Sequence, residues 1–143
     1  MRQGLPAGSK ICCYFQQSMA WVYVEGPWEV DQVRRARDYF EAARADHPLT
    51  SPWGLAVVVS GSSVCSPEAL LALRAAALQD SRLLGRAATA WVIAPEVEGR
   101  AIMPTVLSSV YQDICPLAVF DNEPEAEEWL RQQLAELASQ VER

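Results

Sequence analysis

Short apolar runs alternate along this chain with longer segments in which apolar residues recur every three or four positions. The first two runs, ICCYF within residues 10–16 and MAWVYV within residues 19–25, are separated only by Gln17 and Ser18. Two β-like runs joined by so short a connection predict an antiparallel hairpin. Gly26 and Pro27 then end the second strand.

Three further apolar runs predict the remaining strands. Residues 55–59 (LAVVV) and 87–94 (AATAWVIA) are continuously apolar, which is typical of parallel strands covered on both faces. We expect residues 55–59 to lie in the middle of the sheet. Residues 115–120 (CPLAVF) predict a short last strand, in which Pro116 fits only the start of the strand or a sheet edge.

The segments between these runs have the spacing of amphipathic helices. We expect helices at about residues 28–46, 67–80 and 100–113, followed by a terminal helix that begins after Asn122. Pro104 indicates either that the third helix starts near residue 103 or that it kinks there.

The outward face of the first helix is rich in charge. Arg34 and Asp38 are four residues apart, as are Arg37 and Glu41, and this spacing favours ion pairs along one helix. We therefore interpret this face as solvated and internally paired rather than as an anion site.

The element order is thus ββαβαβαβα. Alternating strands and helices with short connections predict a mostly parallel sheet with right-handed crossovers, to which the hairpin adds the antiparallel member. The predicted fold is α/β: a single domain over residues 10–143, with a mixed five-stranded sheet and about four helices. Residues 1–9 are expected to form a flexible lead-in.

The junction between the central strand and the second helix is the first candidate site. Ser60, Gly61, Ser62 and Ser63 turn the chain, and Ser66 precedes the helix. Backbone N–H groups at a helix start, next to glycine and small hydroxyls, are able to hold an anion or a phosphorylated serine. The alternative is that Ser66 only caps the helix while the other residues form a turn.

The second and third helices suggest an interaction surface. The second is apolar on almost every side, and both should lie side by side because they follow consecutive parallel strands. We expect an apolar patch for self-association or for a protein partner. Its candidate residues are Leu71, Arg74, Leu78, Met103 and Leu107.

Composition narrows the possible functions. The chain has 143 residues and a formal net charge of −6, which disfavours a nucleic-acid surface. No apolar run approaches the roughly 20 residues needed to span a bilayer, and no signal peptide is recognisable. We therefore expect a cytoplasmic protein.

The cysteines and the single histidine give little sign of chemistry. Cys12, Cys13, Cys65 and Cys115 form no CxxC pair, and His47 is the only histidine, so neither a metal site nor a cofactor is expected. Cys65 precedes a helix, where a thiol pKa can be lowered, but no other catalytic group accompanies it. No catalytic triad or nucleotide-binding motif is present either, so we do not expect an enzyme.

Four features resemble the STAS superfamily, which includes anti-sigma-factor antagonists and uncharacterised bacterial relatives. They are the strand that closes in Gly26-Pro27-Trp28, the strand before a serine-rich loop and helix, the later strand AATAWVIA, and the ending AVFDNEPEAEEWL. The resemblance covers about residues 10–137. It implies a non-enzymatic regulatory domain that acts through protein contacts.

The antagonists in that superfamily carry an Asp-Ser phosphoacceptor in the loop after the central strand. Here the corresponding residues 60–66 read SGSSVCS and contain no aspartate. A related branch resembles lipid-carrying CRAL–TRIO domains, which gives the alternative of a carrier for an apolar small molecule or lipid held between the helices. An enzyme that uses Cys65 is the third hypothesis.

Overall fold

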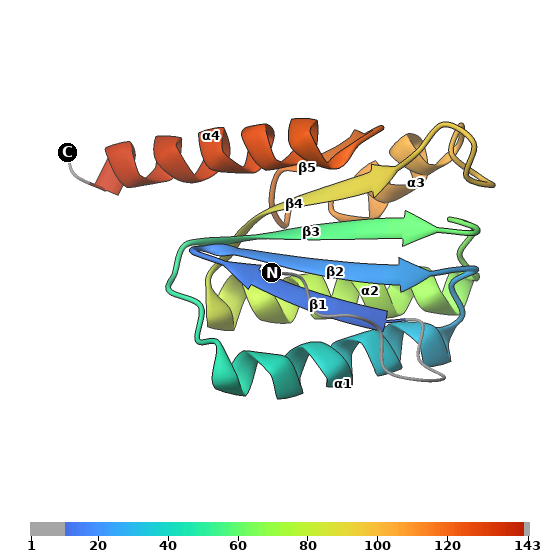
Figure 1. Ribbon diagram of the computed structural model, residues 1–143, viewed down its shortest axis with the longest axis horizontal. Coiled ribbons are helices and arrows are strands. Elements are labelled where there is room, and N and C mark those ends of the chain that lie inside the picture. The colour runs from blue at the N-terminus through green and yellow to red at the C-terminus, as the bar shows by residue number, and fades with distance from the viewer. Residues whose placement is uncertain (1–10, 142–143) are drawn as a thin grey trace.

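The computed structural model describes residues 11–141, so the predicted lead-in at residues 1–9 lies outside the described part (Figure 1). The strands are β1 (Ile11–Gln16), β2 (Met19–Glu25), β3 (Trp53–Ser60), β4 (Arg86–Ile93) and β5 (Leu117–Phe120). The helices are α1 (Val30–Asp46), α2 (Pro67–Gln79), the π-helical turn η1 (Asp80–Leu84), α3 (Met103–Val110) and α4 (Glu123–Val141). The element order ββαβαβαβα is confirmed.

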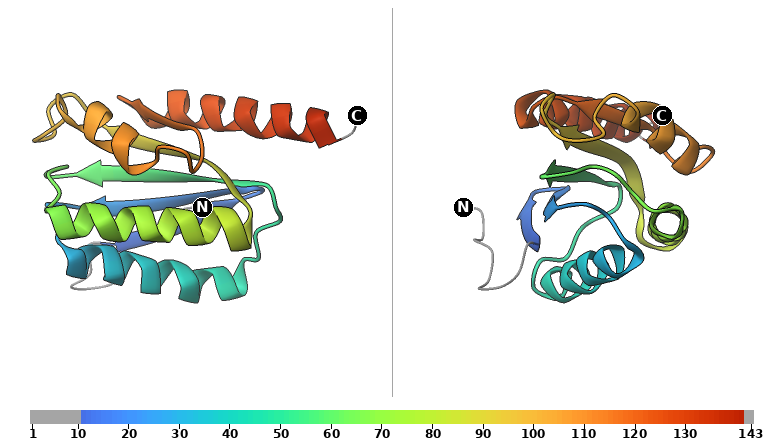
Figure 2. Two further views of the ribbon diagram at one scale, coloured as in Figure 1. Left: turned by 180° about the vertical axis from the view of Figure 1, so that it is seen from behind. Right: turned by 90° about the vertical axis from the view of Figure 1, so that its right-hand side faces the viewer.

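The five strands form one sheet in the order of the chain, β1-β2-β3-β4-β5. β1 runs antiparallel to β2, and every other neighbouring pair is parallel. β3 is the central strand, as its continuous apolar run predicts. Because right-handed crossovers between successive neighbours all turn to the same side, α1, α2 and α3 share one face of the sheet. α4 follows the last strand and covers the other face (Figure 2).

Alternate residues of the strands enter two separate cores. In β2, Val22 and Val24 face α1 and α2, whereas Met19 and Trp21 face the side of α4. This alternation follows from the two-residue period of a strand. The sheet is therefore buried on both sides, and each side has its own packing.

Local signals in the sequence set the start and the end of α2. Ser66 caps the helix, because its Oγ accepts a hydrogen bond from the N–H of Ala69 at 3.1 Å, and Pro67 occupies the first turn. At the other end, η1 stops at Gly85, whose φ of +86° belongs to the left-handed region. A Cβ at Gly85 would also collide with Ser51, so this turn requires glycine.

The third helix is shorter than its sequence pattern indicates. The apolar spacing predicts residues 100–113, whereas the helix spans Met103–Val110. Pro104 lies in its first turn, which settles the choice between a late start and a kink in favour of the late start. The residues before it form turns, and the Arg100 Nε donates to the carbonyl oxygen of Ile93 at 2.7 Å.

None of the helices within residues 11–141 has the length and apolar character needed to cross a membrane.

Candidate functional site

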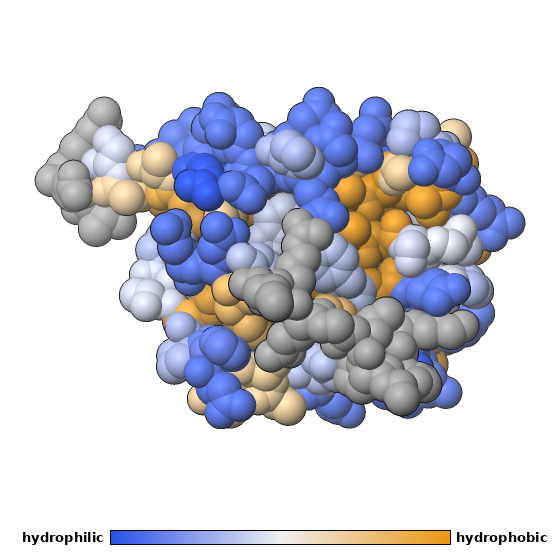
Figure 3. Space-filling model, viewed as in Figure 1, coloured by the Kyte–Doolittle hydropathy of each residue, from blue (hydrophilic) through white to orange (hydrophobic). Residues whose placement is uncertain are grey.

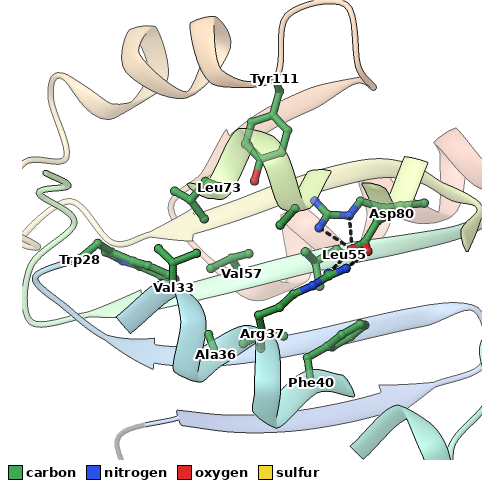
Figure 4. Close-up of a pocket in the computed structure, with 13 residues that line it drawn as sticks. Trp28, Val33, Ala36, Arg37, Phe40, Leu55, Val57, Leu73, Asp80 and Tyr111 are labelled. Carbon is green, nitrogen blue, oxygen red and sulfur yellow. Dashed lines mark hydrogen bonds and ion pairs between the residues drawn. The ribbon is translucent and has the colours of Figure 1, made fainter. Parts of the chain in front are cut away.

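A cavity lies between α1 and α2, above the face of β2 and β3 that these helices cover (Figure 4). The cavity has a volume of about 60 Å³, several times the roughly 10–15 Å³ that one water requires. The lining residues are Val22, Trp28, Val33, Ala36, Arg37, Phe40, Leu55, Val57, Leu73, Ala76, Asp80, Arg86 and Tyr111. Eight of these thirteen side chains contain only carbon, so most of the wall offers a ligand nothing but van der Waals contact.

The cavity opens to solvent between the two helices. Ala36 on α1 and Ala76 on α2 are half-buried lining residues, and Arg37 lies beside them. Alanine reaches only to Cβ, so the two helices leave space between their facing surfaces. Larger side chains at Ala36 or Ala76 would fill it.

One end of the cavity holds a buried charged cluster. Asp80, which is 1% exposed, receives Nε and Nη2 of Arg86 on its Oδ2 at 3.2 and 2.7 Å. Arg37 reaches the same carboxylate from α1, with Nη1 2.8 Å from Oδ2 and Nη2 2.6 Å from Oδ1. A buried carboxylate thus pairs with two guanidinium groups from different elements.

The cluster sets the protonation state of Asp80. Burial by itself raises the pKa of this carboxyl, but the hydrogen bonds and charges of Arg37 and Arg86 outweigh burial and hold the pKa below its ordinary value of 3.8. Asp80 is therefore ionised at neutral pH. The pKa of Arg37 is correspondingly raised, because its contacts with Asp80 outweigh the opposing effect of its own burial.

Tyr111 places a hydroxyl at the roof of the cavity. Figure 4 shows this hydroxyl pointing into the space between Leu73 and the charged cluster at Asp80. The Tyr111 Oη accepts a hydrogen bond from Trp91 Nε1 at 3.2 Å. Burial raises the pKa of Tyr111, so the hydroxyl keeps its proton at neutral pH.

Trp28 forms the wall at the opposite end. It is 2% exposed and packs on Trp91, with ring centroids 5.3 Å apart. Its Nε1 is buried, and no group in the described part of the chain accepts its hydrogen. A buried N–H without an acceptor carries a desolvation cost of about 1–3 kcal/mol. The Trp28 Nε1–H is therefore a hydrogen-bond donor that is available to a ligand in the cavity.

The serine-rich loop holds Trp28 in place. The N–H of Trp28 donates to the carbonyl oxygen of Val64 at 2.8 Å, and the N–H of Ser66 donates to the carbonyl oxygen of Trp28 at 3.0 Å. Gly26 allows this close approach, because a Cβ there would overlap the carbonyl oxygen of Ser62. The loop thus joins the end of β3 to the chain that follows β2.

The hydroxyls of this loop are largely occupied by structural contacts. Ser63 is fully buried, and its Oγ donates to the carbonyl oxygen of Glu98 at 2.6 Å. Ser62 Oγ accepts from the N–H of Val64 at 3.2 Å, while Ser66 caps α2. Ser60 and Gly61 are exposed. The loop is therefore located as predicted, at a helix start, and the capping alternative accounts for Ser66.

The predicted interaction surface is only partly a surface. Leu71 is 70% exposed and Leu78 is half-buried. Arg74 ties α2 to the end of α3 through the carbonyl oxygen of Val110 at 2.7 Å. The prediction is wrong for Met103 and Leu107, which are 1% and 0% exposed, because α3 turns its apolar side into the core that it shares with α2.

Burial keeps the thiols of Cys13 and Cys65 protonated, and His47 is exposed. Burial, with a smaller contribution from the charge of Glu29, raises the pKa of the Cys65 thiol to about 12, so the helix start does not create a thiolate. Burial likewise raises the pKa of Cys13 to about 12. His47 is exposed and stacks on Phe15 with ring centroids 5.3 Å apart.

A second, wider hollow lies on the side of α4, at the ends of β3 and β4. Its floor is apolar, and its rim is the acidic start of α4; Figure 3 shows exposed apolar surface on this face. The lining residues are Val58, Val59, Val92, Ala94, Asp121, Asn122, Glu123, Pro124, Glu127 and Glu128. It contains no buried charged cluster of the kind seen between α1 and α2.

Sequence reasoning missed the cavity and its charged end. Asp80 was expected only as the end of a helix, and Arg37 as part of a solvated face. The available signal was Asp80 and Arg86, two charges that bracket a turn between an apolar helix and an apolar strand.

Comparison of the chain with protein-family models, with curated proteins and with solved structures finds no significant match.

Proposed function

We propose that this chain is a non-enzymatic binding domain that takes a small, mostly apolar molecule into the cavity between α1 and α2. The observation that carries the proposal is the combination of an apolar space with buried polar groups that converge on it. Ligand sites have this composition, because apolar walls supply affinity and a few fixed polar groups orient the ligand.

The polar groups in the cavity are arranged for binding rather than for reaction. Asp80 forms ion pairs with both Arg37 and Arg86, and its lowered pKa makes it a poor general base. Tyr111 is held protonated. The lining contains no serine, cysteine or histidine that would serve as a nucleophile.

Filling the cavity tests this proposal. Ala76→Leu places a larger side chain at the opening, whereas Ala75→Leu adds the same atoms to an exposed position on the same helix. Binding of two probes, 1-hexanol and hexanoate, is followed by ¹H–¹⁵N NMR. We expect wild type and Ala75→Leu to bind at least one probe and Ala76→Leu to bind neither. Unchanged binding by Ala76→Leu, or binding of neither probe by wild type, would contradict the proposal.

A second candidate function is protein interaction, which the STAS resemblance implies. The observation in its favour is the exposure of Leu71 in the middle of α2, because an isolated leucine at 70% exposure leaves apolar surface uncovered. Under this proposal the chain self-associates through α2. Sedimentation velocity over a range of concentrations should then show a dimer that Leu71→Lys abolishes, and a wild type that stays monomeric at every concentration would remove the idea.

A further inference from the structure

We infer that the ligand of the α1–α2 cavity is a small apolar monocarboxylate, whose carboxylate lies against Arg86 and the Tyr111 hydroxyl. The inference rests on the proposed binding function and adds the chemical class of the ligand. It follows from counting the hydrogen-bond donors and acceptors that surround the cavity.

Asp80 is the only carboxylate among the described residues that line the cavity, and its Oδ2 is already occupied. Three N–H groups, two from Arg86 and one from Arg37, donate to this oxygen. Arg37 Nη2 forms an ion pair with Oδ1 at 2.6 Å, but Oδ1 accepts no hydrogen bond from the described residues. The carboxylate therefore leaves a ligand one acceptor, which lies directly beside the Arg37 guanidinium.

Arg86 has donors beyond those that Asp80 accepts. A guanidinium carries five N–H groups, and Arg86 uses two on Asp80 and one on Thr89 Oγ1, at 3.2 Å. Arg86 and Tyr111 line the same cavity, and the positive charge of Arg86 acts to lower the pKa of Tyr111 against the effect of burial. The Arg86 side chain is 4% exposed, so bulk water does not readily reach its remaining N–H groups.

The Tyr111 hydroxyl has a proton to donate. Its oxygen accepts from Trp91 Nε1 and lines the same cavity as Arg86, and no group in residues 11–140 is seen to accept its hydrogen. The Nε1–H of Trp28, at the other end, is the second unsatisfied donor that lines the cavity. Donors therefore outnumber acceptors around this space: the remaining Arg86 N–H, the Tyr111 O–H and the Trp28 Nε1–H stand against one open acceptor, Asp80 Oδ1.

The charges point in the same direction. The charged residues that line the cavity are Arg37, Arg86 and one carboxylate, which leaves one excess positive charge on its wall. Glu41 lies 3.6 Å from Arg37 Nη2 but outside the lining, and the side chains of Arg37 and Glu41 are 21% and 47% exposed, so water screens this pair. An anionic head group is complementary to this excess charge, whereas a cationic head group would be repelled.

Three probes that share a six-carbon chain separate the head group from the chain: hexanoate, 1-hexanol and hexylamine. Titrations of the full chain, followed by NMR at neutral pH, should show hexanoate binding about tenfold more tightly than 1-hexanol, the difference expected of one charge-assisted hydrogen bond. Hexylamine should bind more weakly than 1-hexanol.

Equal affinities for hexanoate and 1-hexanol would overturn the carboxylate while leaving the cavity as an apolar site. Preference for hexylamine would overturn it as well. Binding of none of the three probes would instead remove the proposed function, and this inference with it. The outcome for the head group is thus distinct from the outcome for the cavity.

Tyr111→Phe tests the contact itself, because it removes the hydroxyl and keeps the ring. We expect the variant to lower the affinity for hexanoate by about tenfold and therefore to reduce the ratio of the hexanoate affinity to the 1-hexanol affinity. Arg131→Gln, at the exposed Arg131–Glu127 pair of α4, is the matched control and should leave hexanoate binding unchanged. Full hexanoate affinity in Tyr111→Phe would overturn the assignment, and if that variant does not fold, the three-probe comparison on wild type still decides.

Discussion

In strands β3 and β4, the face beneath α4 carries small side chains, whereas the opposite face carries larger ones. On the first face, Ala56, Ala88 and Ala90 are fully buried, and a Cβ added to Gly54 would come within 3.0 Å of Leu130. On the opposite face, Trp53 and Trp91 are fully buried. The same two strands therefore meet two different helical layers.

The two sides also differ in how completely they are filled. Small residues let α4 approach β3 and β4 closely, as the short distance from the Gly54 position to Leu130 shows. On the opposite side a cavity lies between α1 and α2, where Ala36 and Ala76 are too small to fill it. Within residues 11–140, the buried charged side chains, Asp80 and Arg86, also lie on this side. The proposed ligand site therefore belongs to the less completely filled side.

Removing the carboxylate of the buried cluster should have the largest effect. Asp80→Ala leaves Arg37 and Arg86 without their shared partner in a buried site, and we expect it to lower the free energy of unfolding by about 3–5 kcal/mol. Asp121→Ala breaks the more exposed ion pair with Arg100 and should cost less than about 1 kcal/mol. Urea unfolding of the two variants measures both, and equal small losses would contradict a strongly coupled buried cluster.

The same cluster predicts a specific loss of stability in acid. The pKa of Asp80 is lower in the folded protein than its ordinary value of 3.8, so its stabilisation is fully present above that value. It is lost as the pH falls below 3.8 and through the lowered pKa of the folded state. Urea midpoints measured from pH 7 to pH 2 should therefore fall more steeply below pH 4 for wild type than for Asp80→Asn. Parallel curves would contradict the lowered pKa.

Truncating one leucine on each side of the sheet tests the contrast in packing. Leu130 belongs to α4 and is fully buried against the sheet, whereas Leu73 on α2 borders the cavity. We expect Leu130→Ala to cost about 4 kcal/mol and Leu73→Ala about 2 kcal/mol, because the second loses fewer contacts. Thermal unfolding checks the order, and a larger loss for Leu73→Ala would reverse the comparison.

Enlarging one alanine on each side should give the opposite pair of results. Ala90→Leu forces extra atoms into the packed layer under α4 and should destabilise the protein by about 1–3 kcal/mol. Ala76→Leu extends into existing space and should change the free energy of unfolding by less than about 0.5 kcal/mol. Equal losses in urea unfolding would show that the space between α1 and α2 is not available to added atoms.

The architecture was readable from the sequence because the strands are short, strongly apolar and well separated. Residues 55–59 indicated the central strand, and Asn122 indicated the start of α4, where its Oδ1 accepts the N–H of Glu125 at 3.0 Å. The ion pair of Arg37 with Glu41 also formed as the four-residue spacing predicts. These features depend on neighbours in the chain, which a sequence displays directly.

The cavity was not readable, because it depends on residues that only the fold brings together. Arg37 is 43 residues from Asp80 in the chain and reaches it across the gap between two helices. The prediction that Met103 and Leu107 are exposed was wrong for a related reason, since the rotation of α3 about its axis decides which side of the helix is buried. The STAS resemblance, and the regulatory role of the loop at Ser60–Ser66, stay predictions.

Two buried indoles, one on each side of the sheet, provide the most direct test. Trp28 lines the cavity and Trp21 lies in the core on the side of α4, and the Nε1 of each lacks an acceptor among the described residues. In a ¹H–¹⁵N NMR titration with hexanoate, the Nε1–H signal of Trp28 should move in a saturable way while that of Trp21 stays in place. A stationary Trp28 signal, or a Trp21 signal that moves with it, would contradict a ligand site between α1 and α2.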